Sequence, residues 1–189
     1  MENITEEILN YLGNTHTKVE KKEGFMGNYY SHLIDTIYIS ENFENKEVPN
    51  DAKNINKKAA ELITVCHECV HSMQSKYMHL LNTIFANTSI ILAIICVIIG
   101  LFWASPLWLK ITTSIVILIS IVIRLILETG AVNGSVSLAR EVTEKGIVSD
   151  IAVDDIEEST KYINKHKFLA LIQMITDKII FLILVIIIK

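Results

Sequence analysis

The residues best suited to chemistry form the motif His67-Glu68-Cys69-Val70-His71, inside a stretch with helical spacing. Residues four apart on a helix share one face, so His67 and His71 can present imidazole nitrogens to one metal ion. Glu68 stands beside them, within reach of a metal-bound water. The alternative is that the motif is a chance match on a solvent-exposed helix face that carries two histidines. The apolar flanks favour a site for one zinc ion, because histidines without a ligand are poor packing material there.

The same stretch contains a second pattern, Cys66-x-x-Cys69. This spacing is typical of thiol redox sites and of thiolate zinc sites. A redox motif usually begins a helix, whereas this one stands inside a helix. Both cysteines are rotated off the face that His67 and His71 share, so we expect them to pack into the core. Cys96 is expected to be a small apolar residue within an apolar span.

A catalytic zinc site needs three protein ligands and an open position for water. Glu128 is the best candidate for the third ligand, because it ends an apolar run in which an unpaired carboxylate is costly. The alternative is an ion pair with Arg124, one helical turn earlier. The weaker candidates for the third ligand are Glu141, Asp150, Asp154, His79 and His166.

The composition favours a membrane protein. Of the 189 residues, 51% are hydrophobic and 20% are charged, which is too apolar for an ordinary soluble domain. The net charge of -4 gives no basic surface for nucleic acid. Three cysteines, one of them in an apolar run, do not suggest a secreted disulfide framework.

Two apolar runs predict a helical hairpin in a membrane. The run from Ile84 to Trp103 has about 20 residues, enough to cross ~30 Å of hydrocarbon. Pro106 breaks the helix, and Leu107 to Leu127 forms the second run. A third run, Phe168 to Ile188, is also expected to span. Its adjacent Asp177 and Lys178 leave an interfacial helix as the alternative.

Charge asymmetry predicts the orientation. Lysines and arginines gather in the polar segments before and after the hairpin, whereas the hairpin turn offers only Lys110. The positive-inside rule then places both polar segments in the cytoplasm. We therefore expect a multi-pass protein of the cell membrane with its active site on the cytoplasmic side.

The two polar segments are each too small to bury a good core, but together they could form one domain. Within them, Ile34 to Ser40 alternates apolar and polar residues and predicts a short strand. The stretch from Asn50 to Asn82 has helical spacing, with Asp51 as its N-cap. A helix from Glu128 to about Lys145 should end in a turn, before a last helix that runs into the third span. The predicted division is residues 1–82 and 128–167 for the two halves of the domain, 83–127 for the hairpin and 168–189 for the third span.

The order of these elements resembles the bacterial neutral zinc metallopeptidases of the YugP-like membrane group. The similarity lies in a short strand, an H-E-x-x-H helix followed closely by a glutamine (VCHECVHSMQ), a hydrophobic hairpin and the sequence Glu128-Thr-Gly-Ala131. A Gly146-Ile147-Val148 turn before the closing helix is also similar. The resemblance covers roughly residues 28 to 188.

This resemblance implies that His67, His71 and Glu128 bind zinc and that Glu68 is the catalytic base, the gluzincin arrangement. The implied activity is that of a zinc-dependent metalloendopeptidase, which hydrolyses peptides or membrane-associated proteins with a zinc-bound water that Glu68 activates. No aspartate stands four residues after Glu128 to orient a zinc histidine, and Asn133 is a weak substitute.

Further candidates are less specific. Tyr162 and His166 could stabilise the oxyanion, although ordinary interfacial anchors would look the same. The strand around Tyr38 could receive a substrate by edge pairing, although a core strand would look the same in the sequence. The expected fold is mainly α, with about three transmembrane helices and a small zincin-like domain at the membrane surface.

The expected partners are a peptide or protein substrate and the lipid bilayer, with no nucleic acid and an oligomeric state that the sequence leaves open. A non-catalytic zinc-binding scaffold or partner subunit, derived from a metalloprotease, is the main alternative. A zinc-handling membrane protein would need polar ligands inside the spans, where only Asp177 is available.

Overall fold

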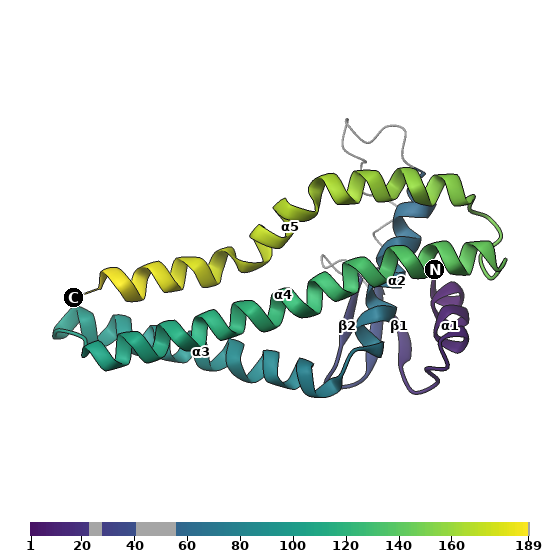
Figure 1. The fold of residues 1–189 in the computed structure, drawn as a ribbon. Coiled ribbons are helices and arrows are strands. Elements are labelled where there is room, and N and C mark those ends of the chain that lie inside the picture. Colours follow the sequence, from purple (N-terminus) through teal and green to yellow (C-terminus); the bar gives the residue numbers. More distant parts are fainter. Residues whose placement is uncertain (23–27, 41–55, 189) are drawn as a thin grey trace. The chain divides into compact units, whose positions relative to one another are not determined.

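The computed structural model describes residues 1–22, 28–40 and 56–188, apart from the side chains of residues 162–171, 173 and 174. The protein is mainly helical with one small sheet, as expected. The predicted N-cap Asp51 lies outside the described residues. The elements, in chain order, are α1 (Glu2–Tyr11), β1 (Lys18–Lys22), β2 (Tyr29–Ser31), β3 (Thr36–Ser40), α2 (Lys57–Met73), α3 (Lys76–Phe102), α4 (Leu107–Glu144) and α5 (Val153–Ile187) (Figure 1).

The chain divides into two compact units. The polar unit comprises Met1–Gln74 and Thr129–His166, and the apolar unit comprises Ser75–Glu128 and Lys167–Lys189. Both α4 and α5 contribute to each unit, because each of these helices continues through a boundary.

The sheet of the polar unit has the strand order β1-β3-β2. Strand β1 runs parallel to β3, whereas β2 runs antiparallel to it. The strand predicted from Ile34 to Ser40 is confirmed as β3, without its first two residues. Because both edges of β3 are paired, the expectation that it receives a substrate by edge pairing is wrong.

One hydrophobic core joins the two polar segments of the sequence. Its fully buried side chains come from α1, β3, α2, the second half of α4 and the start of α5, and include Ile8, Ile37, Leu62, Val142 and Ile156. Burial of this shared apolar area stabilises the polar unit.

Helix α2 carries the H-E-x-x-H motif. Its N-cap is Asn56, whose side-chain oxygen accepts a hydrogen bond from the backbone N–H of Lys58 at 3.0 Å. The helix ends at Met73, because Gln74 has an extended backbone conformation and Ser75, with a ψ of 120°, is not helical either. The single helix predicted through to Asn82 is therefore wrong, since α3 begins separately at Lys76.

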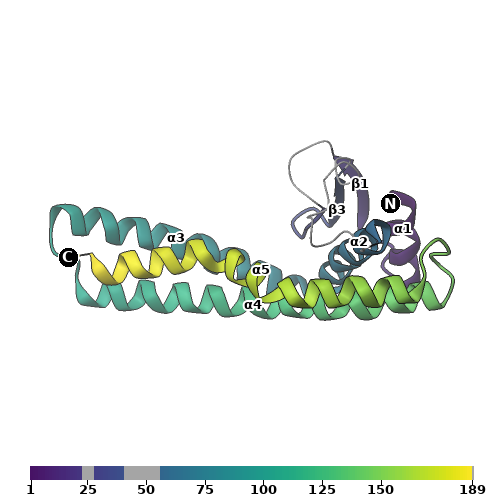
Figure 2. The ribbon, with the colours of Figure 1, turned by 90° about the horizontal axis from the view of Figure 1, so that it is seen from above.

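The apolar unit contains two helices, α3 and α4, that are long and apolar enough to span a membrane by length and composition. The predicted break at Pro106 is confirmed. Helices α3, α4 and α5 lie alongside one another in this unit (Figure 2), around a small cluster that contains Ala93, Ile117 and Val185. Cys96 is buried in the same cluster, as predicted.

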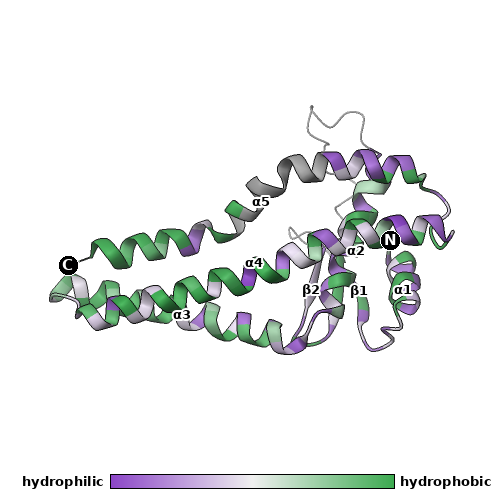
Figure 3. Cartoon of the chain, viewed as in Figure 1, coloured by the Kyte–Doolittle hydropathy of each residue, from purple (hydrophilic) through white to green (hydrophobic). Residues whose placement is uncertain are grey.

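Hydrophobic residues predominate along α3 and the first half of α4 (Figure 3), and many of their large apolar side chains are exposed. Helix α5 continues through the third predicted span as far as Ile187, but its crossing of a membrane stays a prediction.

Helix α4 is continuous over 38 residues. The separate helix predicted to begin at Glu128 is thus the second half of α4, and Glu128 lies inside a regular helix. Gly146 has a φ of 70° shortly after the helix ends, which confirms the predicted turn at a position that favours glycine.

Candidate metal centre

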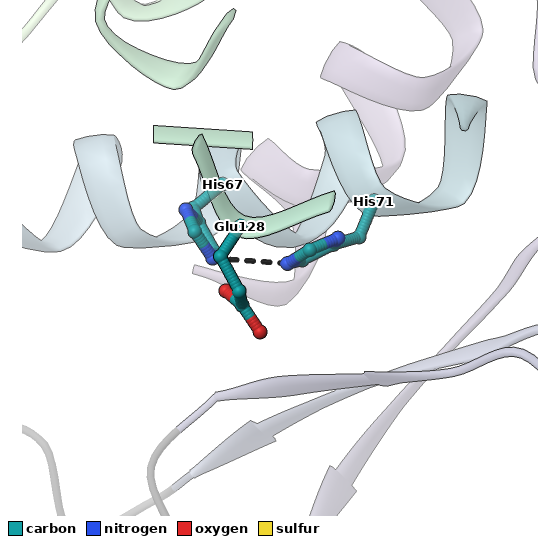
Figure 4. A group of neighbouring side chains, drawn as sticks. All are labelled: His67, His71 and Glu128. Carbon is teal, nitrogen blue, oxygen red and sulfur yellow. Dashed lines mark hydrogen bonds between the residues drawn. The ribbon is translucent and has the colours of Figure 1, made fainter. Parts of the chain in front are cut away.

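Three side chains converge at the end of α2. His67 and His71 lie on the same face of α2, one turn apart, and their Nε2 atoms are 3.1 Å from each other. The carboxylate of Glu128, from α4, lies near the two facing ring nitrogens (Figure 4), and one ligand atom from each of the three residues lies within 4.8 Å of the others. We call these three residues the metal triad.

The separations suit a metal ion. A tetrahedral zinc ion with bonds of about 2.0–2.1 Å keeps two ligand atoms about 3.3 Å apart. The 3.1 Å between the two Nε2 atoms is close to this value, and the carboxylate oxygen, which lies within 4.8 Å of them, would need to move by up to about 1.5 Å to match it. Two imidazoles and one carboxylate also suit zinc chemically and leave a fourth position open. The metal triad could therefore hold a metal ion.

Gln74 orients His71. The Nδ1 atom of His71 lies 2.8 Å from Oε1 of Gln74, which can accept a hydrogen bond but cannot donate one. Nδ1 therefore carries the proton, and the lone pair of Nε2 faces His67. Sequence reasoning noted this glutamine without assigning it a role. Its spacing of three residues from His71, which places it near the same helix face, was the available signal.

Glu68 is buried, and strand β2 holds its carboxylate. Its Oε2 atom accepts a hydrogen bond of 2.7 Å from the backbone N–H of Tyr30 in the edge strand β2. The Tyr30 hydroxyl donates to Asp35 at 3.0 Å, and burial together with this bond raises the pKa of Tyr30. Strand β2 thus holds the carboxylate of the residue that follows His67 on α2.

Two glycines let α4 approach α2 closely. A Cβ atom on Gly134 would lie 3.0 Å from a methyl group of Val70, and one on Gly130 would lie 3.1 Å from Nε2 of Gln74. Glu128 precedes Gly130 on the same continuous helix, so this contact positions its carboxylate. The alternative prediction, an ion pair with Arg124, is confirmed at 3.9 Å between Nε and Oε1.

The weaker third-ligand candidates lie elsewhere. Within the described part of the chain, the metal triad is the one group of histidine, cysteine, aspartate or glutamate residues with metal-ligand proximity. Glu141 pairs with Lys145 at 2.8 Å, Asp150 lies 3.9 Å from Lys58, Asp154 is exposed and His79 is buried in α3.

The remaining predicted residues are Asn133, Tyr162 and His166. Asn133 is exposed on α4, where its backbone carbonyl accepts a hydrogen bond of 3.4 Å from Ser137. Its role in orienting a ligand stays a prediction. The side chains of Tyr162 and His166 lie outside the described residues, so their role near an oxyanion stays a prediction too.

Cys66 and Cys69 are fully buried in the core of the polar unit, as predicted. Burial raises the pKa of the Cys66 thiol well above its usual range and that of Cys69 to about 12. Both thiols are therefore protonated at neutral pH, which disfavours redox chemistry and thiolate ligation by this pair.

No protein-family model, curated protein or solved structure matches the chain. The candidate metal centre therefore rests on the geometry of its own residues.

Proposed function

We propose that this protein is a membrane-embedded zinc metalloendopeptidase. The observation that carries the proposal is the convergence of His67, His71 and Glu128, with Glu68 held next to the first histidine. The order of elements that resembles the neutral zinc metallopeptidases supports the same activity. The substrates would be peptides or membrane-associated proteins.

His67, His71 and Glu128 would hold one zinc ion, which when bound supplies a Lewis acid that polarises a peptide carbonyl and lowers the pKa of water. Glu68 would accept the proton of the attacking water and pass it to the leaving amine. The Tyr30 N–H donates a hydrogen bond to Oε2 of this carboxylate. The bond to Tyr30 holds the carboxylate in place and so lowers the entropy cost of the proton transfer.

The two apolar helices support a location in the cell membrane. Helices α3 and α4 would form the hairpin, and the apolar part of α5 would form the third span of a multi-pass protein. The excess of lysine and arginine outside the hairpin turn supports a cytoplasmic metal centre.

The activity can be tested on protein purified in detergent and incubated with a complex mixture of peptides, with mass spectrometry as the readout. We expect cleavage by the wild type, and a loss of about 10²- to 10⁴-fold in Glu68→Gln. Glu61→Gln is the matched control, because Glu61 is a buried acid on the same helix. Zinc content is measured for each protein, so that loss of the base is separated from loss of the metal.

A zinc-binding scaffold without activity is the second candidate. The ion pair between Arg124 and Glu128 favours it, because this pair gives the carboxylate a structural partner. A zinc-loaded wild type that leaves the peptide mixture intact, with no difference from Glu68→Gln, would support the scaffold and reject the peptidase.

A further inference from the structure

A few large apolar side chains of the polar unit are exposed to solvent. Among its described residues, the exposed large apolar side chains are Leu33, Ile34 and Met73, with exposed fractions of 73%, 57% and 51%. Isolated exposed apolar residues are common on protein surfaces. Two adjacent exposed aliphatic side chains at the tip of a turn are less common, and they indicate a site that binds another apolar surface.

Leu33 and Ile34 occupy the turn between β2 and β3. The turn closes at Asp35, which has a φ of 51°, a left-handed conformation that aspartate tolerates better than most residues. The Asp35 carboxylate accepts hydrogen bonds from Tyr30 at 3.0 Å and from Thr17 at 2.8 Å. The turn is therefore held in one conformation with its two aliphatic side chains outward.

Hydrogen bonds tie this turn to the last turn of α2. The Asn14 amide donates to Thr17 at 2.9 Å and to Ser72 at 3.0 Å. Thr17 in turn donates to Asp35, and Ser72 donates to the Cys69 carbonyl at 2.7 Å. The β2–β3 turn thus lies at the end of the polar unit that contains Met73.

The chain leaves the polar unit at this same end. Met73 is the last residue of α2, and α3, one of the two helices long and apolar enough to span a membrane, begins at Lys76. The first turns of α3 expose Tyr77 and Leu80. Among the described residues, the exposed apolar side chains of the polar unit thus include one at the end of α2, from which the chain continues into α3.

We propose that the tip of the β2–β3 turn, Leu33 and Ile34, inserts into the lipid surface beside the entry of α3. A turn tip is convex, which suits insertion among acyl chains rather than the binding of an extended peptide. The one acidic residue of the turn, Asp35, accepts hydrogen bonds from Tyr30 and Thr17 of the polar unit. The contact would fix the distance of the metal triad from the bilayer, and it rests on the membrane location in the proposed function.

Fluorescence in vesicles tests the contact. Leu33→Trp is made in a Trp103→Phe, Trp108→Phe background and reconstituted in phosphatidylcholine vesicles that contain brominated lipids. The bromines are placed either near the headgroup end or near the methyl end of the acyl chains. We expect strong quenching of Leu33→Trp by the shallow bromines and weak quenching by the deep ones. Ile34→Trp is the second variant, and we expect the same pattern from it.

Glu144→Trp in the same background is the control, because Glu144 is exposed and lies about 24 Å along α4 from Glu128. We expect its emission to be quenched by aqueous iodide and not by either lipid. The inference is overturned if both turn variants behave like Glu144→Trp. It is also overturned if they are shielded from lipid and iodide alike, which would show that protein covers the turn.

The native Trp103 and Trp108 distinguish failure of this inference from failure of the membrane proposal. Both residues are exposed at the predicted hairpin turn. If the brominated lipids quench them in the wild type but spare the turn variants, the lipid contact alone is rejected. If the lipids quench none of these tryptophans, the membrane location and the contact are both rejected.

Discussion

The two halves of α4 differ in where they place their apolar side chains. In the first half, which belongs to the apolar unit, Leu118 is 49% exposed. In the second half, which belongs to the polar unit, Leu138 is 6% exposed and contributes to the core. One regular helix therefore carries apolar surface suited to lipid and then apolar surface buried against protein. Glu128 marks the change from one to the other.

The largest effect is expected from Leu138→Ala, and Leu118→Ala is its counterpart in the first half of α4. Leu138→Ala creates a cavity in the polar unit and should lower its free energy of unfolding by about 2–5 kcal/mol. Leu118→Ala removes an exposed side chain and should change the free energy of unfolding of the protein by about 0.5 kcal/mol. Chemical unfolding in detergent micelles, followed by circular dichroism, measures both. Equal losses in the two variants would mean that both halves of α4 face a protein interior.

The two units also differ in the hydrogen bonding of their buried polar side chains. In the first half of α4, the buried hydroxyl of Ser120 has no hydrogen-bond partner in the described structure. In the polar unit, His71 is held by Gln74. Gln74→Leu should therefore weaken zinc binding about 10- to 100-fold, because the ring loses the partner that sets its tautomer. A zinc-chelator competition titration measures this change.

Two control variants separate the loss of His71 orientation from a general change in packing. Gln74→Glu keeps an acceptor for Nδ1 of His71 and should retain most of the zinc affinity, whereas Ser120→Ala should leave the affinity unchanged. If Gln74→Leu binds zinc as tightly as the wild type, Gln74 does not orient the ligand.

The smallest effect concerns the contact between α4 and α2. In Gly134→Ala, the new methyl group meets Val70, and such overpacking costs about 1–3 kcal/mol. Alanine also favours the helix by about 0.5–1 kcal/mol, so we expect a net loss of about 1 kcal/mol in the free energy of unfolding. Val70→Ala should rescue the variant by removing the methyl groups. Destabilisation that persists in the double variant would contradict a local clash.

Patterns within one element could be predicted from the sequence. Alternation identified β3, Pro106 identified the break between α3 and α4, and the four-residue spacing identified the shared face of His67 and His71. The burial of Cys66 followed from its rotation away from that face.

Features that depend on tertiary contacts could not be predicted in this way. Strand β1 reads Lys-Val-Glu-Lys-Lys, and its pairing with β3 overrides its low apolar content. The break after Met73 was missed because the apolar spacing continues through it from α2 into α3. The bond from Tyr30 to Glu68 joins a backbone group to a side chain 38 residues away, and no sequence pattern encodes such a contact.

The most direct test of the account is the zinc content of the purified protein by elemental analysis, with Glu128→Ala and Glu141→Ala beside the wild type. Glu141 is the matched control, because it lies exposed on the same helix and pairs with Lys145. We predict about one zinc ion per chain in the wild type and in Glu141→Ala, and a large loss in Glu128→Ala. A wild type without zinc, or a Glu128→Ala protein that keeps it, would contradict the metal triad.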